Sequence, residues 1–286
     1  MKNILCIALS ALSLAYMPGL CAGVSAAAQE ADINTYSATA EKRYSASGLA
    51  RGGLLQGSEE RDVYYSSKTV DEYKSKYGAP TFISSKDNAC AVTAGGKVLV
   101  FYDCRYDDIV PDYSPRFLYG TYIYGGQNDG IENMFDTLYS AMGTTSDGTT
   151  VEGFKSGMRQ YVTSNNHGIN ITSTTGSYYN MNIDYLKSQL KTDTPAVVFF
   201  DTFSISTAGS FTEYDGHDNI RHEKYGGHHT MLVYGYKDIV YYNADGSTKQ
   251  RDFYLHVSTG VVGLPTALVD ITHFCNVDDA YIMEVA

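Results

Sequence analysis

The stretch Ser85-Lys-Asp-Asn-Ala-Cys90-Ala-Val-Thr-Ala94 decides the fold, because a polar loop becomes helix-like at Cys90. A buried helix from Cys90 to about Tyr102 is predicted by its apolar residues, which are Val92, Val98, Leu99, Phe101 and Tyr102. Gly95 and Gly96 interrupt it, and each costs about 1 kcal/mol relative to alanine. Such a cost is typical of a helix that approaches another element closely. A cysteine at the start of a helix also meets unpaired N–H groups, which favour the thiolate.

A histidine begins a second informative stretch, His229-Thr-Met-Leu-Val-Tyr-Gly235-Tyr236, which predicts a strand. An imidazole at the mouth of a strand can face a cleft and accept a proton from a thiol. A cysteine paired with such a base becomes a nucleophile at neutral pH. Each residue alone is equally compatible with a structural role, so the prediction of Cys90 and His229 as catalytic residues depends on the pair.

The order of the expected elements indicates an α+β fold, with helices first and antiparallel strands later. Besides the cysteine-bearing helix, helices are expected at residues 69–77, 131–142, 149–161 and 183–190, and residues 103–130 are expected to be loop. Strands are expected at residues 196–200, 230–236, 239–242, 252–257 and 280–285. We therefore expect an N-terminal helical half, including the cysteine-bearing helix, to pack on a C-terminal antiparallel sheet.

The N-terminal region divides into two segments. Residues 1–28 resemble a secretory signal, with Lys2, an apolar run from Ile4 to Met17 and small residues before the expected cleavage site. Residues 29–67 are polar without a sustained apolar period, which predicts a flexible tether or a pro-segment. Residues 68–286 are expected to form one domain, and the protein is expected to be secreted, in the extracellular space or the cell envelope.

The charge of the chain restricts its partners. A net charge of −11 and a pI near 5.0 argue against nucleic acid or an anionic membrane surface as a partner. The apolar part of the signal is too short to span a bilayer, and no later segment is long and apolar enough. We therefore expect no membrane span.

The cysteines and histidines leave two questions open. Cys90, Cys104 and Cys275 remain after the signal, which fits one free thiol with a Cys104–Cys275 disulfide, or three unpaired cysteines. Four histidines gather in one stretch with two aspartates, but their spacing matches no zinc pattern; they are His217, His222, His228 and His229, with Asp215 and Asp218. No metal and no cofactor are therefore expected.

The two informative stretches resemble a known family. Cys90-Ala-Val-Thr93-Ala94-Gly95 is similar to the cysteine-helix motif of papain-fold cysteine peptidases of the bacteriocin-leader-peptidase-like group, and His229–Tyr236 is similar to their histidine strand. The resemblance runs from about residue 70 to the end of the chain. It implies a papain-like fold and hydrolysis of a polypeptide substrate through an acyl-thioester. It also implies Cys90 as nucleophile, His229 as general base and the Cys90 backbone N–H as one oxyanion donor.

The chain departs from the family pattern at three positions. A glutamine normally precedes the cysteine as the second oxyanion donor, and the only neutral polar candidates here are Ser84, Ser85 and Asn88. An asparagine or aspartate normally orients the histidine, and the matching stretch offers Ser258 or Thr259. Val261 stands where a tryptophan usually shields that pair.

These departures keep two other functions open. Losing one oxyanion donor costs on the order of 10²–10³ in rate. The chain is therefore also compatible with a catalytically impaired papain-fold envelope binding module, whose tyrosine-rich loops at residues 106–124 would form the contact surface. An acyltransferase that uses the same dyad with an amine acceptor is the third interpretation.

Overall fold

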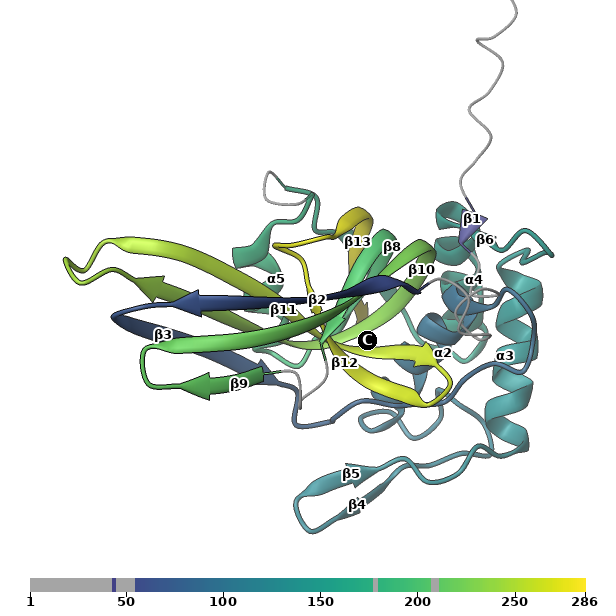
Figure 1. The fold of residues 1–286 in the computed structure, drawn as a ribbon. Coiled ribbons are helices and arrows are strands. Elements are labelled where there is room, and N and C mark those ends of the chain that lie inside the picture. Colours follow the sequence, from purple (N-terminus) through teal and green to yellow (C-terminus); the bar gives the residue numbers. More distant parts are fainter. Residues whose placement is uncertain (1–42, 45–54, 177–179, 207–210) are drawn as a thin grey trace, which may run out of the picture. The chain divides into compact units, whose positions relative to one another are not determined.

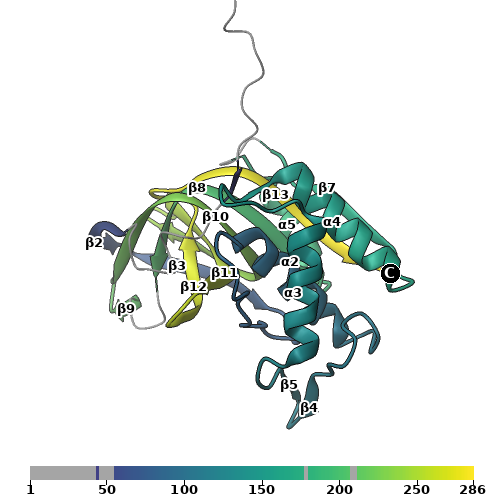
Figure 2. The ribbon, with the colours of Figure 1, turned by 90° about the vertical axis from the view of Figure 1, so that its right-hand side faces the viewer.

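We analysed a computed structural model, which describes residues 43–44, 55–176, 180–206 and 211–286. Over these residues the protein has a mixed α/β fold with a large, nine-stranded antiparallel sheet and four helices. Helices α2, α3 and α4 gather on one side of this sheet (Figures 1 and 2). None of the helices in this part of the chain combines the length and apolar character needed to cross a membrane.

Most of the expected helices are confirmed. The structure contains α2 (Cys90–Asp103), α3 (Asp129–Ala141), α4 (Val151–Ser164) and α5 (Ile183–Leu190). Three of them begin with a side-chain oxygen that accepts a hydrogen bond from the first turn, which stabilises the helix start; these caps are Asn128, Thr150 and Asn182. In contrast, α2 begins without a side-chain cap, so the start of the cysteine helix depends on packing.

The sheet is organised around one very long strand, β10 (His217–Tyr242), which covers two predicted strands at once. It pairs with β2 (Leu55–Tyr64), β3 (Ser67–Lys74), β8 (Ala196–Ser206), β9 (Phe211–Tyr214) and β11 (Thr248–Val261). The sheet continues with β12 (Leu264–Asp270), β13 (Asn276–Val285) and β7 (Ile169–Ser173). Two small sheets pair β1 (Arg43–Tyr44) with β6 (Thr149–Thr150), and β4 (Arg116–Leu118) with β5 (Thr121–Ile123).

Two predictions for the N-terminal part are wrong. The helix expected at residues 69–77 is instead β3, which pairs residue by residue with the second half of β10. Part of the expected tether is β2, which pairs with the first half of β10. Both strands are mostly exposed, so their hydrogen bonds to β10 rather than an apolar stripe determine their structure. Removal of the expected tether, residues 29–67, would therefore delete β2. Residues 29–42 and 45–54 of the expected tether lie outside the described part.

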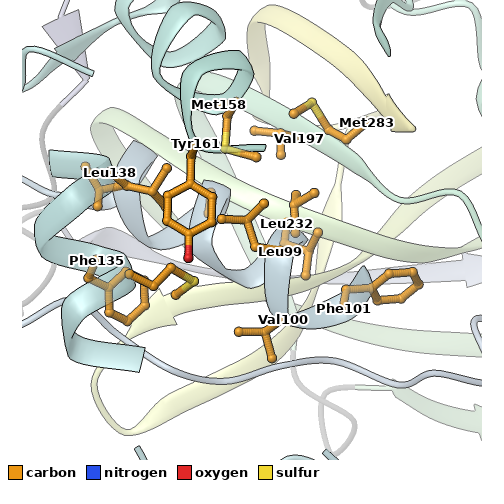
Figure 3. Close-up of a cluster of buried hydrophobic side chains, with 14 of the residues drawn as sticks. Leu99, Val100, Phe101, Phe135, Leu138, Met158, Tyr161, Val197, Leu232 and Met283 are labelled. Atoms are coloured by element: carbon orange, nitrogen blue, oxygen red, sulfur yellow. The ribbon is translucent and has the colours of Figure 1, made fainter. Parts of the chain in front are cut away.

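The sheet separates two hydrophobic cores. On one face, Leu99 and Phe101 of α2 and Phe135 of α3 pack with Val197 of β8 and Leu232 of β10 (Figure 3). On the other face, alternate residues of the same strands pack against α5, among them Val198, Phe200, Met231 and Val233. Side chains alternate between the faces of a strand, so neighbours such as Val197 and Val198, or Met231 and Leu232, pack in different cores. A third, smaller cluster includes Ile220, Ile239 and Tyr241 of β10.

The glycines of α2 allow the expected close approach. A Cβ atom at Gly96 would lie 2.4 Å from Cε1 of Phe135, which is buried. Gly96→Ala is therefore expected to destabilise the protein by about 1–3 kcal/mol, because the clash outweighs the higher helix propensity of alanine. Chemical denaturation measures this change. Gly126→Ala is the matched control because Gly126 has open space around it, and a change within about 0.5 kcal/mol is expected there. Equal effects of both variants would contradict the packing argument.

Candidate active site

Cys90 is the first residue of α2, and its side chain is only 2% exposed. Its Sγ lies 3.8 Å from Oγ1 of Thr230 on β10. Burial raises the pKa of the thiol to about 11, and this outweighs the hydrogen bonds from Thr230 and the helix start, which lower it. The sulfur is therefore a protonated thiol at neutral pH, and a base has to remove its proton before it can act as a nucleophile.

The contacts of the His229 ring are with residues other than Cys90. The ring is fully buried, stacks on Phe203 with 5.7 Å between centroids, and places Nε2 2.7 Å from the carbonyl oxygen of Thr259. This contact makes Nε2 a donor, and Nδ1 has no hydrogen-bond partner. Burial lowers the pKa of His229 to about 4, so the ring is neutral at pH 7. Within the described part of the chain, no hydrogen bond joins Cys90 to His229.

The alternation of β10 explains why these two residues do not meet. Thr230 contacts Cys90, and Leu232 packs in the α2 core, so both side chains point to the α2 face. Met231 packs in the opposite core, and His229, which stacks on Phe203 of that core, points the same way. The sequence motif selects His229 on this strand, but the adjacent His228 has different contacts.

His228 precedes His229 on β10 and is two residues from Thr230, which contacts Cys90. Its Nδ1 lies 3.0 Å from Oδ1 of Asp201 on β8, and both side chains are partly exposed. Asp201 in turn accepts a hydrogen bond from Nδ2 of Asn276 at 3.2 Å, which orients its carboxylate. An imidazole beside an oriented carboxylate has a defined tautomer, and this is a common arrangement for a general base.

The bulges of three neighbouring strands create this cluster. The pairing of β10 with β8 is irregular between Gly226 and His229. His228 of β10 and Asp201 of β8 lie in this interval, outside the regular register. Pairing of β13 with β8 is irregular on both sides of Val277, so Asp278 also lies outside the regular register. Bulges re-aim side chains, and here they bring donor atoms of Asp201, His228 and Asp278 within 4.8 Å of one another.

Lys97 is a charged residue that the functional prediction did not include. It is fully buried in α2, seven residues after Cys90, and its Nζ has no hydrogen-bond partner. A Cβ atom at Gly260 of β11 would lie 3.7 Å from Nζ, which places the amine at the edge of that strand. Burial lowers the pKa of the amine to about 7. A single lysine inside the apolar run of α2 was the available signal.

The proposed oxyanion donors before Cys90 have other contacts. The backbone N–H of Ser84 donates to Oγ1 of Thr93 at 3.1 Å, and Oγ of Ser85 donates to Glu132 at 3.4 Å. Nδ2 of Asn88 donates to the carbonyl oxygen of Ser146 at 2.7 Å. Each of these three residues therefore has a hydrogen bond to a group other than Cys90.

The proposed orienting hydroxyls also have other partners. Oγ of Ser258 donates to the carbonyl oxygen of Pro80 at 2.6 Å, and Oγ1 of Thr259 donates to that of Leu264. Only the backbone oxygen of Thr259 contacts His229.

Of the two alternatives for the cysteines, three unpaired thiols is the one that the structure shows, because Cys90, Cys104 and Cys275 are all free in the described part. Sγ of Cys104 lies 3.6 Å from the hydroxyl oxygen of Tyr124, which packs with the α2 core. Cys275 packs with the opposite core. The two cores are separated by the sheet, so the predicted pairing is incompatible with this fold.

No protein-family model, no curated protein and no solved structure matches this chain. A function can therefore be inferred only from the chemistry of the residues themselves. A thiol at a helix start and an imidazole beside a carboxylate are the groups that nucleophilic acyl transfer uses.

Proposed function

We propose that this protein is a secreted cysteine peptidase with a papain-like arrangement, in which Cys90 is the nucleophile and His228 is the general base. The observation that supports this assignment best is the contact of His228 Nδ1 with Asp201, since His228 is two residues from Thr230, which contacts Cys90. If Nδ1–H donates to Asp201, Nε2 keeps its lone pair and can accept the thiol proton. No metal or cofactor takes part in this mechanism.

In the first half-reaction, Nε2 of His228 accepts the proton of the Cys90 thiol as Sγ attacks the peptide carbonyl carbon. The negative charge moves to the carbonyl oxygen, where the backbone N–H of Cys90 can stabilise it. Collapse of this intermediate breaks the C–N bond, and the leaving amine takes the proton from His228. Water, activated by the same imidazole, then hydrolyses the acyl-thioester and restores the thiol.

The spacing on β10 supports this pairing. Sγ of Cys90 contacts Thr230, and His228 is two residues away on the same strand. Two residues of a strand span about 6.6 Å, so a rotation of the Cys90 side chain toward His228 can bring thiol and imidazole together. The same rotation would take the sulfur out of its contact with Thr230, where it is 2% exposed. Substrate binding must therefore accompany a local rearrangement.

Two alternative functions use the same fold. The contact of the Cys90 thiol with a threonine, rather than a histidine, favours a non-catalytic envelope binding module. An acyltransferase would form the same thioester at Cys90 and transfer the acyl group to an amine instead of water.

Hydrolysis of casein by the full chain and its cysteine variants tests this proposal. Cys90→Ala is expected to abolish hydrolysis, because the nucleophile is lost. Cys104→Ala is the matched control, since Cys104 is also a free cysteine but lies near Tyr124, and it is expected to keep the activity. Equal hydrolysis by wild type and Cys90→Ala would refute the proposal, and inactive wild type would favour the binding module. Product masses that include an added amine would identify the acyltransferase.

A further inference from the structure

We infer that Asp201, His228 and Asp278 form a binding site for a divalent transition-metal cation. Their donor atoms all lie within 4.8 Å of one another, and one pair, His228 Nδ1 and Asp201 Oδ1, is 3.0 Å apart. The sequence did not predict this site, because its three residues are far apart in the chain. The inference does not depend on catalysis by Cys90. Binding of the cation needs the lone pair of His228 Nδ1, which carries a proton in the proposed peptidase form, so the metal-bound form and that catalytic form exclude each other.

The site is built by the fold rather than by a flexible surface. Its three residues belong to β10, β8 and β13, which are adjacent in the order β10–β8–β13. Each one lies at a position where the regular register of its strand is interrupted. Hydrogen bonds on both sides of these bulges fix the backbone, so the three side chains start from defined positions.

The distances suit a metal of small radius. Zn²⁺ and similar cations bind imidazole nitrogen and carboxylate oxygen at about 2.0–2.2 Å. Ligands at this distance from one cation are about 3–4 Å from each other, which agrees with the 3.0 Å pair and with the 4.8 Å limit of the cluster. An imidazole with two carboxylates fits Mn²⁺, Fe²⁺ or Zn²⁺ better than Ca²⁺ or Mg²⁺, which prefer oxygen ligands alone.

The local charge favours a cation. Asp278 and Asp201 contribute two carboxylates, and Asp279 adds a third beside them on β13. The nearby cation is Lys155, whose Nζ lies 4.7 Å from the ring centroid of Tyr281, and the hydroxyl of Tyr281 donates to Asp279 at 3.2 Å. Lys155 also pairs with Glu152, so its charge is shared with another carboxylate. A bound divalent cation would offset this excess of negative charge.

Mn²⁺ is the probe of choice, because it binds thiols weakly and free Mn²⁺ has a strong electron paramagnetic resonance signal. The titration uses the full chain with Cys90→Ala, so the Cys90 sulfur cannot contribute. One Mn²⁺ per chain is expected. Asp278→Asn is expected to weaken Mn²⁺ binding at least about tenfold. Loss of a residue that only hydrogen-bonds to a metal ligand already weakens binding by about that factor, and Asp278 is a ligand itself.

Asp279→Asn is the matched control. It removes the same charge from the neighbouring residue of β13 but leaves the three ligands intact, and it is expected to bind Mn²⁺ like the parent. Absence of a stoichiometric site in the parent would overturn the inference. Equal weakening by both variants would also overturn it, because the effect would then come from general charge. Since the parent already lacks the Cys90 thiol, failure of the peptidase proposal would not affect this result.

Discussion

Lys97→Met is expected to stabilise the protein by about 3–5 kcal/mol near pH 7. The lysine amine is fully buried in α2 and has no hydrogen-bond partner, so folding removes it from water without compensation. This burial is the cause that lowers its pKa from 10.5 to about 7. Methionine has a similar length and no charge, so it can fill the same space without the desolvation cost.

The stabilisation should depend on pH in a defined direction. The unfolded lysine keeps its proton up to about pH 10.5, whereas the folded one loses it from about pH 7. Between these values the unfolded state binds more protons, so the stability of the wild type rises with pH. Below about pH 7 the full penalty is present. The advantage of Lys97→Met should therefore shrink by about 2 kcal/mol between pH 7 and pH 9.

Urea denaturation of both proteins at several pH values measures this difference. Lys86→Met is the control, because Lys86 is an exposed lysine whose partner is Asp136 on the surface. That variant is expected to change the stability by less than about 1 kcal/mol, with no trend in pH. A Lys97→Met variant that is less stable than wild type at pH 7 would show that the amine is paired in solution.

Lys97 also connects the cysteine helix with His229. Burial is the main cause that lowers the pKa of His229, and the charge of Lys97 lowers it further. The hydrogen bond to Thr259 acts in the opposite direction and raises it. Nδ1 of His229 and Nζ of Lys97 are both buried without partners. Both groups lie near β11, because Nε2 of His229 contacts the carbonyl oxygen of Thr259 and a Cβ atom at Gly260 would lie 3.7 Å from Nζ of Lys97.

The helices of this fold could be predicted from the sequence because their signals are local. Asn182 and the apolar residues that follow it gave the start of α5 correctly. In contrast, β2 and β3 have almost no apolar pattern, and their structure depends on pairing with β10, which is distant in sequence. A strand that is held mainly by backbone hydrogen bonds to a remote partner has no signature in its own residues.

The candidate site was harder to predict, because the direction of each side chain on β10 changes when the pairing with β8 shifts by one residue. The motif correctly identified α2 as the helix that begins at Cys90, and β10 as the strand with the histidines. A shift by one residue changes the face of every side chain, and the bulge between Gly226 and His229 sets that register. A sequence with two adjacent histidines cannot show which contacts each of them makes.

The two histidines therefore give the most direct kinetic test. His228→Gln is expected to lower kcat/KM for peptide hydrolysis by about 10²–10⁴, because glutamine cannot accept the thiol proton. His229→Gln is the matched variant: its amide can still donate to the carbonyl of Thr259, so activity per folded molecule should remain within a few fold while the stability falls by about 1–3 kcal/mol. Initial rates with a fluorogenic peptide, together with circular dichroism of each variant, separate the two effects. If His229→Gln instead loses the activity and His228→Gln keeps it, the base is the histidine that the sequence motif selects, and β10 must change its register when substrate binds.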